Sequence, residues 1–157
     1  MTIDIDGTEA QWVLGMLPPE RLPDIAVSAL QNGLDSDALR ILAGLSGSEI
    51  DDASKLFEEA LKSLGRGQMS KKDAVRLYAR TISGQILRGE MEPYAGAKKI
   101  WEAALKASEP EFHEVDPFIY AASEYEDRPE DHKFFNNAIR KEAQRWVLIP
   151  GSKQGDS

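Results

Sequence analysis

Apolar residues recur every three or four positions along most of this chain, and Gly or Pro separates one such run from the next. The clearest run lies between Asp51 and Leu64, where the apolar positions follow an unbroken i, i+3, i+4, i+7 series. Its members are Ala53, Leu56, Phe57, Ala60, Leu61 and Leu64. This spacing places all of them on one face, which predicts an amphipathic α-helix.

Start and stop signals predict further helices. Residues suited to an N-cap are Thr8 (with Gln11, a capping box), Ser36, Ser70 and Asp116, and prolines suited to a first helical turn are Pro23, Pro93, Pro117 and Pro129. Glycines that follow a last apolar position are Gly33, Gly65 and Gly89. The alternating segment 2–6 is too short to organise a sheet. These signals predict an all-α fold, an irregular bundle of about seven or eight helices in a single domain.

The length of 157 residues suits one ordinary hydrophobic core. We predict a flexible N-terminal segment at 1–7, a helical domain at 8–149 and a disordered tail at 150–157, where GSKQGDS has nothing to bury. The three tryptophans lie on predicted apolar stripes, which favours core packing over a place at the rim of a cleft. They are Trp12, Trp101 and Trp146.

Cysteine is absent, which excludes disulfides and thiolate metal sites and suits a reducing compartment. The first ten residues, MTIDIDGTEA, hold two aspartates and no base, unlike a secretory signal. The longest apolar runs reach only about five or six residues, whereas a membrane span needs roughly twenty. We therefore expect a cytoplasmic protein that has no membrane association.

The formal charge of −8 argues against nucleic acid as the main partner, because phosphate binding relies on clustered Lys and Arg. This charge is unevenly distributed along the chain. The net charges of successive segments are −9 for 1–61, +6 for 62–108, −8 for 109–131 and +3 for 132–157. Either the opposite charges neutralise one another within the fold, or an acidic surface is left for a basic protein partner.

The histidines offer little for catalysis or metal binding. His113 and Glu114 begin a zinc-helix pattern, but Pro117 occupies the position of its second histidine. A carboxylate-bridged metal site needs Glu three residues before His, and those positions hold Pro110 and Pro129. We therefore predict no metal site, no cofactor and no catalytic residue.

Basic residues recur at steps of four on the segment that follows Ser70. Lys72, Arg76 and Arg80 form a ridge that is predicted to bind an anion, or instead to pair with a neighbouring acidic segment. Nucleic-acid binding by this ridge requires that 109–131 lie far from it. Just before the ridge, the glycines and lysine of 65–71 approach a phosphate loop but follow a helix and lack the third glycine.

Acidic residues crowd around Pro129. They are joined by one histidine, and the predicted partner-binding set is Glu124, Glu126, Asp127, Glu130, Asp131 and His132. Glu126 and Asp127 end a predicted helix, where the helix dipole disfavours negative charge. Arg88 or Arg140 is expected to compensate them, or else a cation or a basic partner does so.

Two stretches of the second half carry a resemblance: LYARTISGQILRGEMEPYAGAKKIW at 77–101 and PFIYAASEYEDRPEDHKFFNNAIRKEA at 117–143. They resemble a family of small acidic all-helical bacterial proteins, in which Pro-Tyr-x-Gly-Ala opens a helix and Ser-Glu-x-Glu-Asp-x-Pro-Glu follows later. The phrases LPDIAVSALQNG and LRILAGL extend the likeness into the first half. The resemblance implies a bacterial cytoplasmic setting and a helical fold. The family has no assigned activity, so it transfers no functional residue.

The first functional hypothesis is a non-enzymatic interaction module whose acidic surface engages a basic protein, with an immunity or antitoxin-like role as one version. The alternative is a small-ligand binder or enzyme in which Glu124, Asp127 and His132 converge with a base in a cleft. A structure in which these side chains are splayed on separate solvated surfaces would exclude the alternative.

Overall fold

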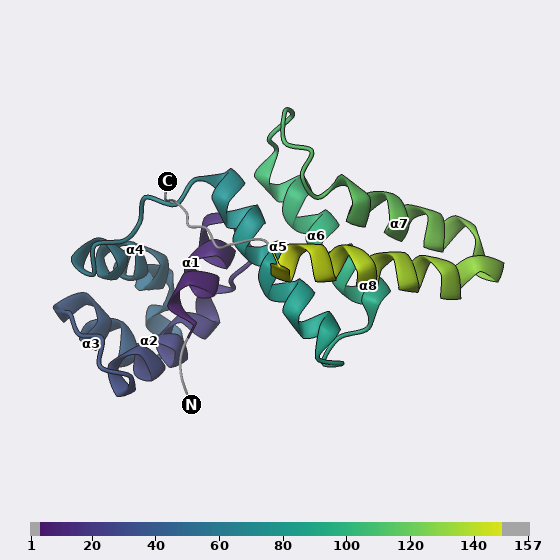
Figure 1. The fold of residues 1–157 in the computed structure, drawn as a ribbon. Coiled ribbons are helices and arrows are strands. Elements are labelled where there is room, and N and C mark those ends of the chain that lie inside the picture. Colours follow the sequence, from purple (N-terminus) through teal and green to yellow (C-terminus); the bar gives the residue numbers. More distant parts are fainter. Residues whose placement is uncertain (1–3, 149–157) are drawn as a thin grey trace. The chain divides into compact units, whose positions relative to one another are not determined.

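A computed structural model describes residues 4–148, and these residues form eight α-helices, three short 3-10 helices and no strand. The predicted all-α class is confirmed. The chain divides into two compact units, with the boundary between Ser70 and Lys71 (Figure 1). The predicted boundaries of a single domain at 8–149 stay a prediction, and the predicted tail at 150–157 lies outside the described residues.

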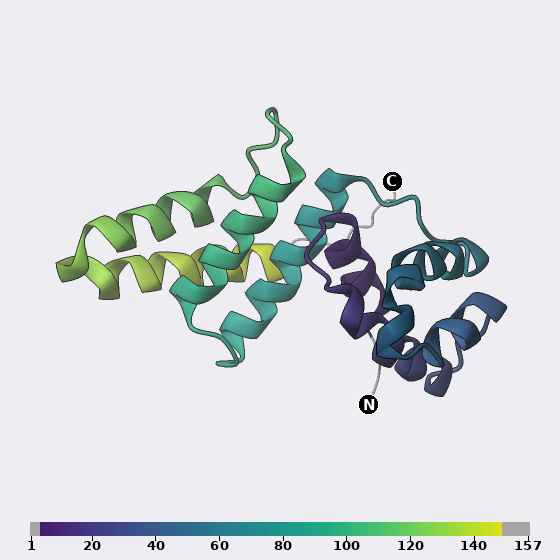
Figure 2. The ribbon, with the colours of Figure 1, turned by 180° about the vertical axis from the view of Figure 1, so that it is seen from behind.

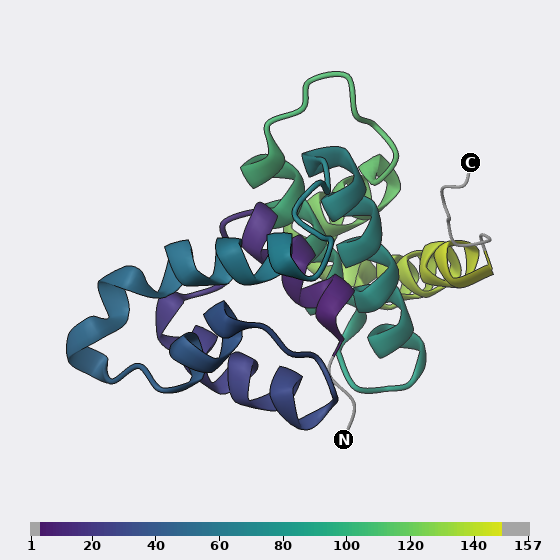
Figure 3. The same cartoon turned by 90° about the vertical axis from the view of Figure 1, so that its left-hand side faces the viewer.

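Unit 1 contains four α-helices and two 3-10 helices. They are α1 (Ile5–Val13), η1 (Pro19–Arg21), α2 (Leu22–Gln31), α3 (Asp37–Ala43), η2 (Gly47–Asp52) and α4 (Ala53–Ser63). Helix α3 packs against both α2 and α4, and these three helices can be followed in Figure 3. Their buried side chains form one core, in which Phe57, Leu22 and Leu42 are among the most completely buried. The apolar stripe predicted at 53–64 faces this core.

Unit 2 contains four longer helices and one 3-10 turn. They are α5 (Lys71–Leu87), α6 (Pro93–Ala107), α7 (Asp116–Asp127), η3 (Pro129–Asp131) and α8 (His132–Leu148). Helices α7 and α8 lie side by side and antiparallel, joined by η3, and α5 packs against α6 and α8 (Figures 1 and 2). Phe118, Ile100 and Ile139 are fully buried among them.

Glycine ends three helices as predicted, at Gly33, Gly65 and Gly89. At Gly65 the backbone has φ of +77°, a conformation that non-glycine residues rarely adopt. The N–H of Gly65 donates to the carbonyl of Lys62 at 3.0 Å, and the N–H of Arg66 donates to that of Leu61 at 2.7 Å. This pair of bonds is a Schellman motif, which satisfies carbonyls that the end of α4 would otherwise leave open.

Several predicted helix starts are confirmed. The hydroxyl of Ser36 accepts a hydrogen bond from the N–H of Leu39 at 3.1 Å, and Pro23, Pro93 and Pro117 lie in the first turns of α2, α6 and α7. Asp116, which was predicted as an N-cap, is instead the first residue of α7, and Val115 precedes it as the cap.

The predicted capping box at Thr8 is wrong. Helix α1 begins at Ile5, and the carboxylate of Asp4 caps it by accepting from the N–H of Gly7 at 2.9 Å. The hydroxyl of Thr8 donates to the backbone carbonyl of Asp4 at 2.9 Å. Residues 5–7 of the segment that we predict to be flexible, 1–7, form the first turn of α1, and the boundary of that segment stays a prediction.

The tryptophans differ in their surroundings. Trp146 is buried, as predicted. Trp12 is half-buried and packs edge-on against Phe57, with ring centroids 5.7 Å apart. Trp101 is also half-buried, and the ammonium of Lys98 lies 4.4 Å from the centre of its ring. Across 4–148, no helix is long and apolar enough to cross a membrane.

Candidate interaction site

The predicted acidic residues lie at the turn that joins α7 to α8. We call residues 124–132 the acidic corner: Glu124, Glu126 and Asp127 end α7, Glu130 and Asp131 lie in η3, and His132 begins α8. Of its five acids, Glu124 and Asp131 lie near Arg128, and Glu126 pairs with Lys98. The corner therefore keeps a net negative charge.

Glu126 is the most tightly held acid of the corner. Its Oε2 accepts hydrogen bonds from the ammonium of Lys98 at 2.7 Å and from the hydroxyl of Tyr94 at 2.5 Å, both on α6. These bonds, that from Lys98 first, lower the pKa of Glu126, and the same carboxylate raises the pKa of Lys98 and of Tyr94. Glu126 is thereby compensated within unit 2.

The expected compensation by Arg88 or Arg140 is wrong. The guanidinium of Arg88 pairs with Glu90, two residues further on, at 3.0 Å. Arg140 donates to the side-chain oxygen of Asn137 at 3.1 Å. Both bases therefore bind residues close to them in the sequence, while Glu126 at the end of α7 is bound by Tyr94 and Lys98 of α6.

Three stacked rings hold the corner in place. The ring centroids of Tyr94 and Tyr125 lie 4.3 Å apart, and those of Tyr125 and His132 lie 3.6 Å apart with the planes inclined by 4°. The Nε2 of His132 lies 2.9 Å from the backbone carbonyl of Tyr125. Because a carbonyl oxygen only accepts, this ring nitrogen carries a proton and donates it. His132 thus fastens the start of α8 to the end of α7.

The other acids of the corner are held weakly or not at all. Arg128 lies 3.7 Å from Glu124 and 4.0 Å from Asp131, at the outer limit of an ion pair. Asp127 and Glu130 are exposed, and neither has an ion-pair partner within residues 4–148. These two carboxylates are exposed charges of the corner without an ion pair in the described residues.

The cleft of the alternative hypothesis stays a prediction. No hydrogen bond or ion pair joins Glu124, Asp127 and His132 to one another in the described part of the chain. His132 uses a ring nitrogen on a backbone carbonyl, and Glu124 lies next to Arg128. In the same part of the chain, no group of three or more His, Asp or Glu side chains is placed to hold a metal ion.

The basic ridge pairs with the acidic segment at Arg76. Its guanidinium binds both carboxylate oxygens of Glu114, at 2.9 and 2.6 Å, and also Asp73 at 2.8 Å. These bonds, that to Glu114 first, raise the pKa of Arg76, and Arg76 lowers the pKa of Glu114. Lys72 and Arg80 lie on the same helix and are half-buried. The anion-binding role of Lys72, Arg76 and Arg80 stays a prediction, with Arg76 already engaged by two carboxylates.

Replacing Glu114 with Gln is expected to lower the stability of unit 2 at pH 7 by less than about 1 kcal/mol, because the pair is half-exposed. The folded-state pKa of Glu114 is depressed. Its contribution is therefore present above the unfolded-state pKa of about 4.3 and is lost as the pH falls through the lower folded value. Urea unfolding of both proteins should show their difference shrinking below about pH 4. A difference that grows in acid would contradict this assignment.

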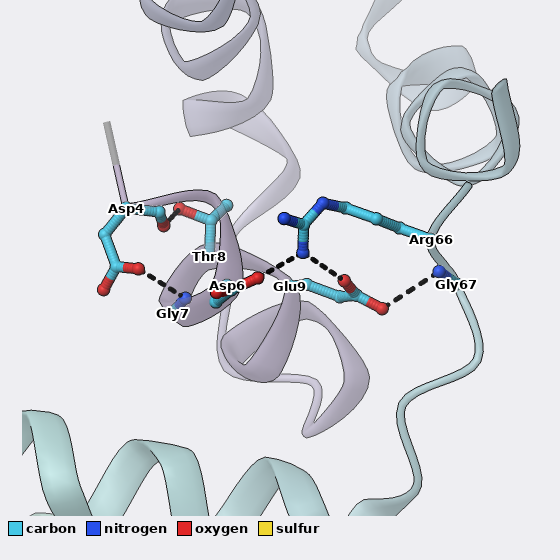
Figure 4. Close-up of polar contacts among 7 residues, drawn as sticks. All are labelled: Asp4, Asp6, Gly7, Thr8, Glu9, Arg66 and Gly67. Carbon is cyan, nitrogen blue, oxygen red and sulfur yellow. Dashed lines mark hydrogen bonds and ion pairs between the residues drawn. The ribbon is translucent and has the colours of Figure 1, made fainter. Parts of the chain in front are cut away.

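A buried carboxylate in unit 1 escaped the sequence analysis. Glu9 of α1 has a side chain only 3% exposed, and its Oε2 accepts from the N–H of Gly67 at 3.0 Å (Figure 4). Arg66 lies 3.5 Å from the other oxygen and also pairs with Asp6. One signal was present in the sequence: Glu9 stands three and seven residues before Trp12 and Met16, on an otherwise apolar stripe.

Backbone N–H groups in the phosphate-loop pattern at 65–71 also take part in these contacts. The N–H groups of Gly65 and Arg66 donate to carbonyls of α4, and that of Gly67 donates to Glu9. A phosphate loop presents such donors to its ligand. In this protein, carbonyls of α4 and the carboxylate of Glu9 already accept hydrogen bonds from these three N–H groups.

No family model, curated protein or solved structure matches this chain. The family resemblance of 77–101 and 117–143 therefore stays a prediction, and function has to be argued from the geometry above.

Proposed function

We propose that this protein is a non-enzymatic interaction module whose acidic corner binds a basic segment of a protein partner. The observation that carries the proposal is that some acids of the corner have partners within the protein and others have none in the described residues. Glu126 is compensated by Lys98 and Tyr94, whereas Asp127 and Glu130 are exposed and have no ion pair within 4–148. Unpaired carboxylates on a fixed turn attract a basic partner and favour it over acidic ones.

Exposed aromatic rings next to the corner supply contact area. Tyr120 is 63% exposed on α7, and Glu124 and Asp127 follow it at i+4 and i+7, on the same helical face. Phe134 is 66% exposed in the first turn of α8. Aromatic side chains are enriched in protein interfaces and among the few residues that dominate the binding energy, and charges on the rim guide association. The surface therefore suits a partner that carries both bases and apolar side chains.

An immunity or antitoxin-like role is the concrete version that we favour. A small acidic protein of this kind would neutralise a basic protein by covering its positive surface. The charge of −8 and the unpaired carboxylates of the corner support this version.

The proposal can be tested with a fluorescein-labelled amphipathic peptide that carries lysines along one helical face and leucines along the other. Binding is measured by fluorescence anisotropy at about 50 mM salt and again at about 300 mM salt, where screening is stronger. We expect the double variant Asp127→Asn, Glu130→Gln to bind about tenfold more weakly than the unmodified protein at the lower salt concentration.

A charge-matched control separates a specific surface from general attraction. Asp51 and Asp52 of unit 1 are exposed acids, and no ion pair of either occurs within 4–148. The variant Asp51→Asn, Asp52→Asn changes the net charge by the same amount and should leave binding within about twofold. If both double variants weaken binding equally, the acidic corner is not the docking surface.

A further inference from the structure

The segment between α4 and α5 crosses the boundary between the two units, which falls after Ser70. Its first residues continue the end of α4, through the backbone bonds of Gly65 and Arg66. Residues 66–70 belong to no helix or turn. Because no regular backbone hydrogen-bonding pattern fixes these residues, contacts with side chains must do so.

The buried carboxylate of Glu9 supplies such a contact. A charged group removed from water is strongly unfavourable unless hydrogen-bond donors replace the water. The N–H of Gly67 and the guanidinium of Arg66 provide that replacement, and both come from the connecting segment (Figure 4). The hydrogen bonds therefore stabilise both the buried carboxylate of Glu9 and the conformation of the segment. Releasing the segment would leave a carboxylate uncompensated in the interior of unit 1.

Gly67 is suited to this contact by its backbone. Its φ of +95° lies in the region that favours glycine, and an added Cβ would meet no atom closer than 3.8 Å. The conformation, and not the space around it, therefore requires glycine. Arg66 adds a second hold on α1 through Asp6, which lies on the same helix as Glu9.

We propose that Glu9 is a latch on the connection between the two units. It fixes the chain as far as Gly67 against α1, and the exposed residue Gln68 is the first residue of the connection beyond the latch. The latch consists of one buried carboxylate, one backbone N–H and one guanidinium. It acts independently of the acidic corner, which lies in unit 2.

An arginine-specific protease tests the latch, because Arg66 lies within the clamped segment and cleavage there leaves fragments 1–66 and 67–157. The variant Glu9→Gln keeps the size of the side chain but removes its charge. We expect these fragments to appear about tenfold faster from the variant than from the unmodified protein, since cleavage reports local opening. Rates within twofold of each other would overturn the proposal.

Two controls keep this result unambiguous. The variant Glu59→Gln removes an exposed acid of α4 in the same unit and should not change cleavage after Arg66. If Glu9→Gln instead exposes Arg21 and Arg40 as fast as Arg66, Glu9 supports the core of unit 1 as a whole, and the latch is overturned.

A measurement on the unmodified protein requires no variant. Amide hydrogen exchange followed by NMR should show the Gly67 amide protected at least about tenfold more than the Gln68 amide. Equal protection of the two amides, after correction for their intrinsic rates, would also overturn the latch.

Discussion

Replacing Phe57 with alanine is expected to lower the free energy of unfolding of unit 1 by about 3 to 5 kcal/mol. Phe57 is 1% exposed and lies in the middle of the unit-1 core. The substitution removes buried apolar area and leaves a cavity that the neighbouring helices can fill only in part. It also removes the edge-on contact with Trp12. A loss of this size is a large share of the stability of a small unit.

Equilibrium urea unfolding, followed by hydrogen exchange of peptides from α2, α3 and α4, measures this loss. Ile41 of α3 provides the control within the same unit, because it is a large apolar residue but is 55% exposed. Ile41→Ala should change the stability of unit 1 by no more than about 0.5 kcal/mol. Similar losses in the two variants would mean that Phe57 does not anchor a core.

Local patterns predicted the helices because the signals that form a helix lie within the helix or next to it. The stripe at 53–64, the proline starts and the terminal glycines are all examples. The mistake at Thr8 has the same local origin. Two candidate caps, Asp4 and Thr8, lie four residues apart, and the capping-box rule favoured the wrong one. Asp4 serves because the N–H of Gly7 lies within reach of its carboxylate.

Contacts between distant segments were not predictable residue by residue. Glu114 is 38 residues from Arg76, and Glu126 is 28 residues from Lys98. Periodicity gives the face of a helix but not the neighbour against which that face packs. For this reason the expected compensation of Glu126 and Asp127 by Arg88 or Arg140 is wrong.

The net charges of whole segments predicted the distant ion pairs better than the choice of individual partner residues did. Both distant pairs, Arg76 with Glu114 and Lys98 with Glu126, join the positive segment 62–108 to the negative segment 109–131. The negative charge of segment 109–131 is thus neutralised within the fold only in part. The negative segment has nine acids, and Asp127 and Glu130 are among those with no ion pair in the described residues. Neutralisation therefore applies to Glu114 and Glu126, and the acidic surface proposed for a basic partner would consist of other residues of the same segment.

Replacing Gly96 with valine is expected to destabilise unit 2 by about 3 kcal/mol. Gly96 faces α5 from within α6, and a Cβ built there would lie 2.6 Å from Cδ1 and 2.9 Å from Cγ1 of Ile86. It would also lie 3.0 Å from Cγ2 of Ile82. Both isoleucines are buried, so neither can move aside into solvent. The side chain must therefore push the two helices apart or force a strained rotamer.

Alanine at the same position separates packing from helix propensity. Gly→Ala within a helix is favourable by about 1 kcal/mol when nothing obstructs the methyl group. Gly84 in α5 meets that condition, because an added Cβ would approach only the guanidinium end of Arg88, which is exposed and flexible. Gly84→Ala should therefore stabilise unit 2 slightly, whereas Gly96→Ala should destabilise it by about 1 kcal/mol. Urea unfolding followed by hydrogen exchange of peptides from α5 and α8 measures both, and equal signs would contradict the close packing of α5 against α6.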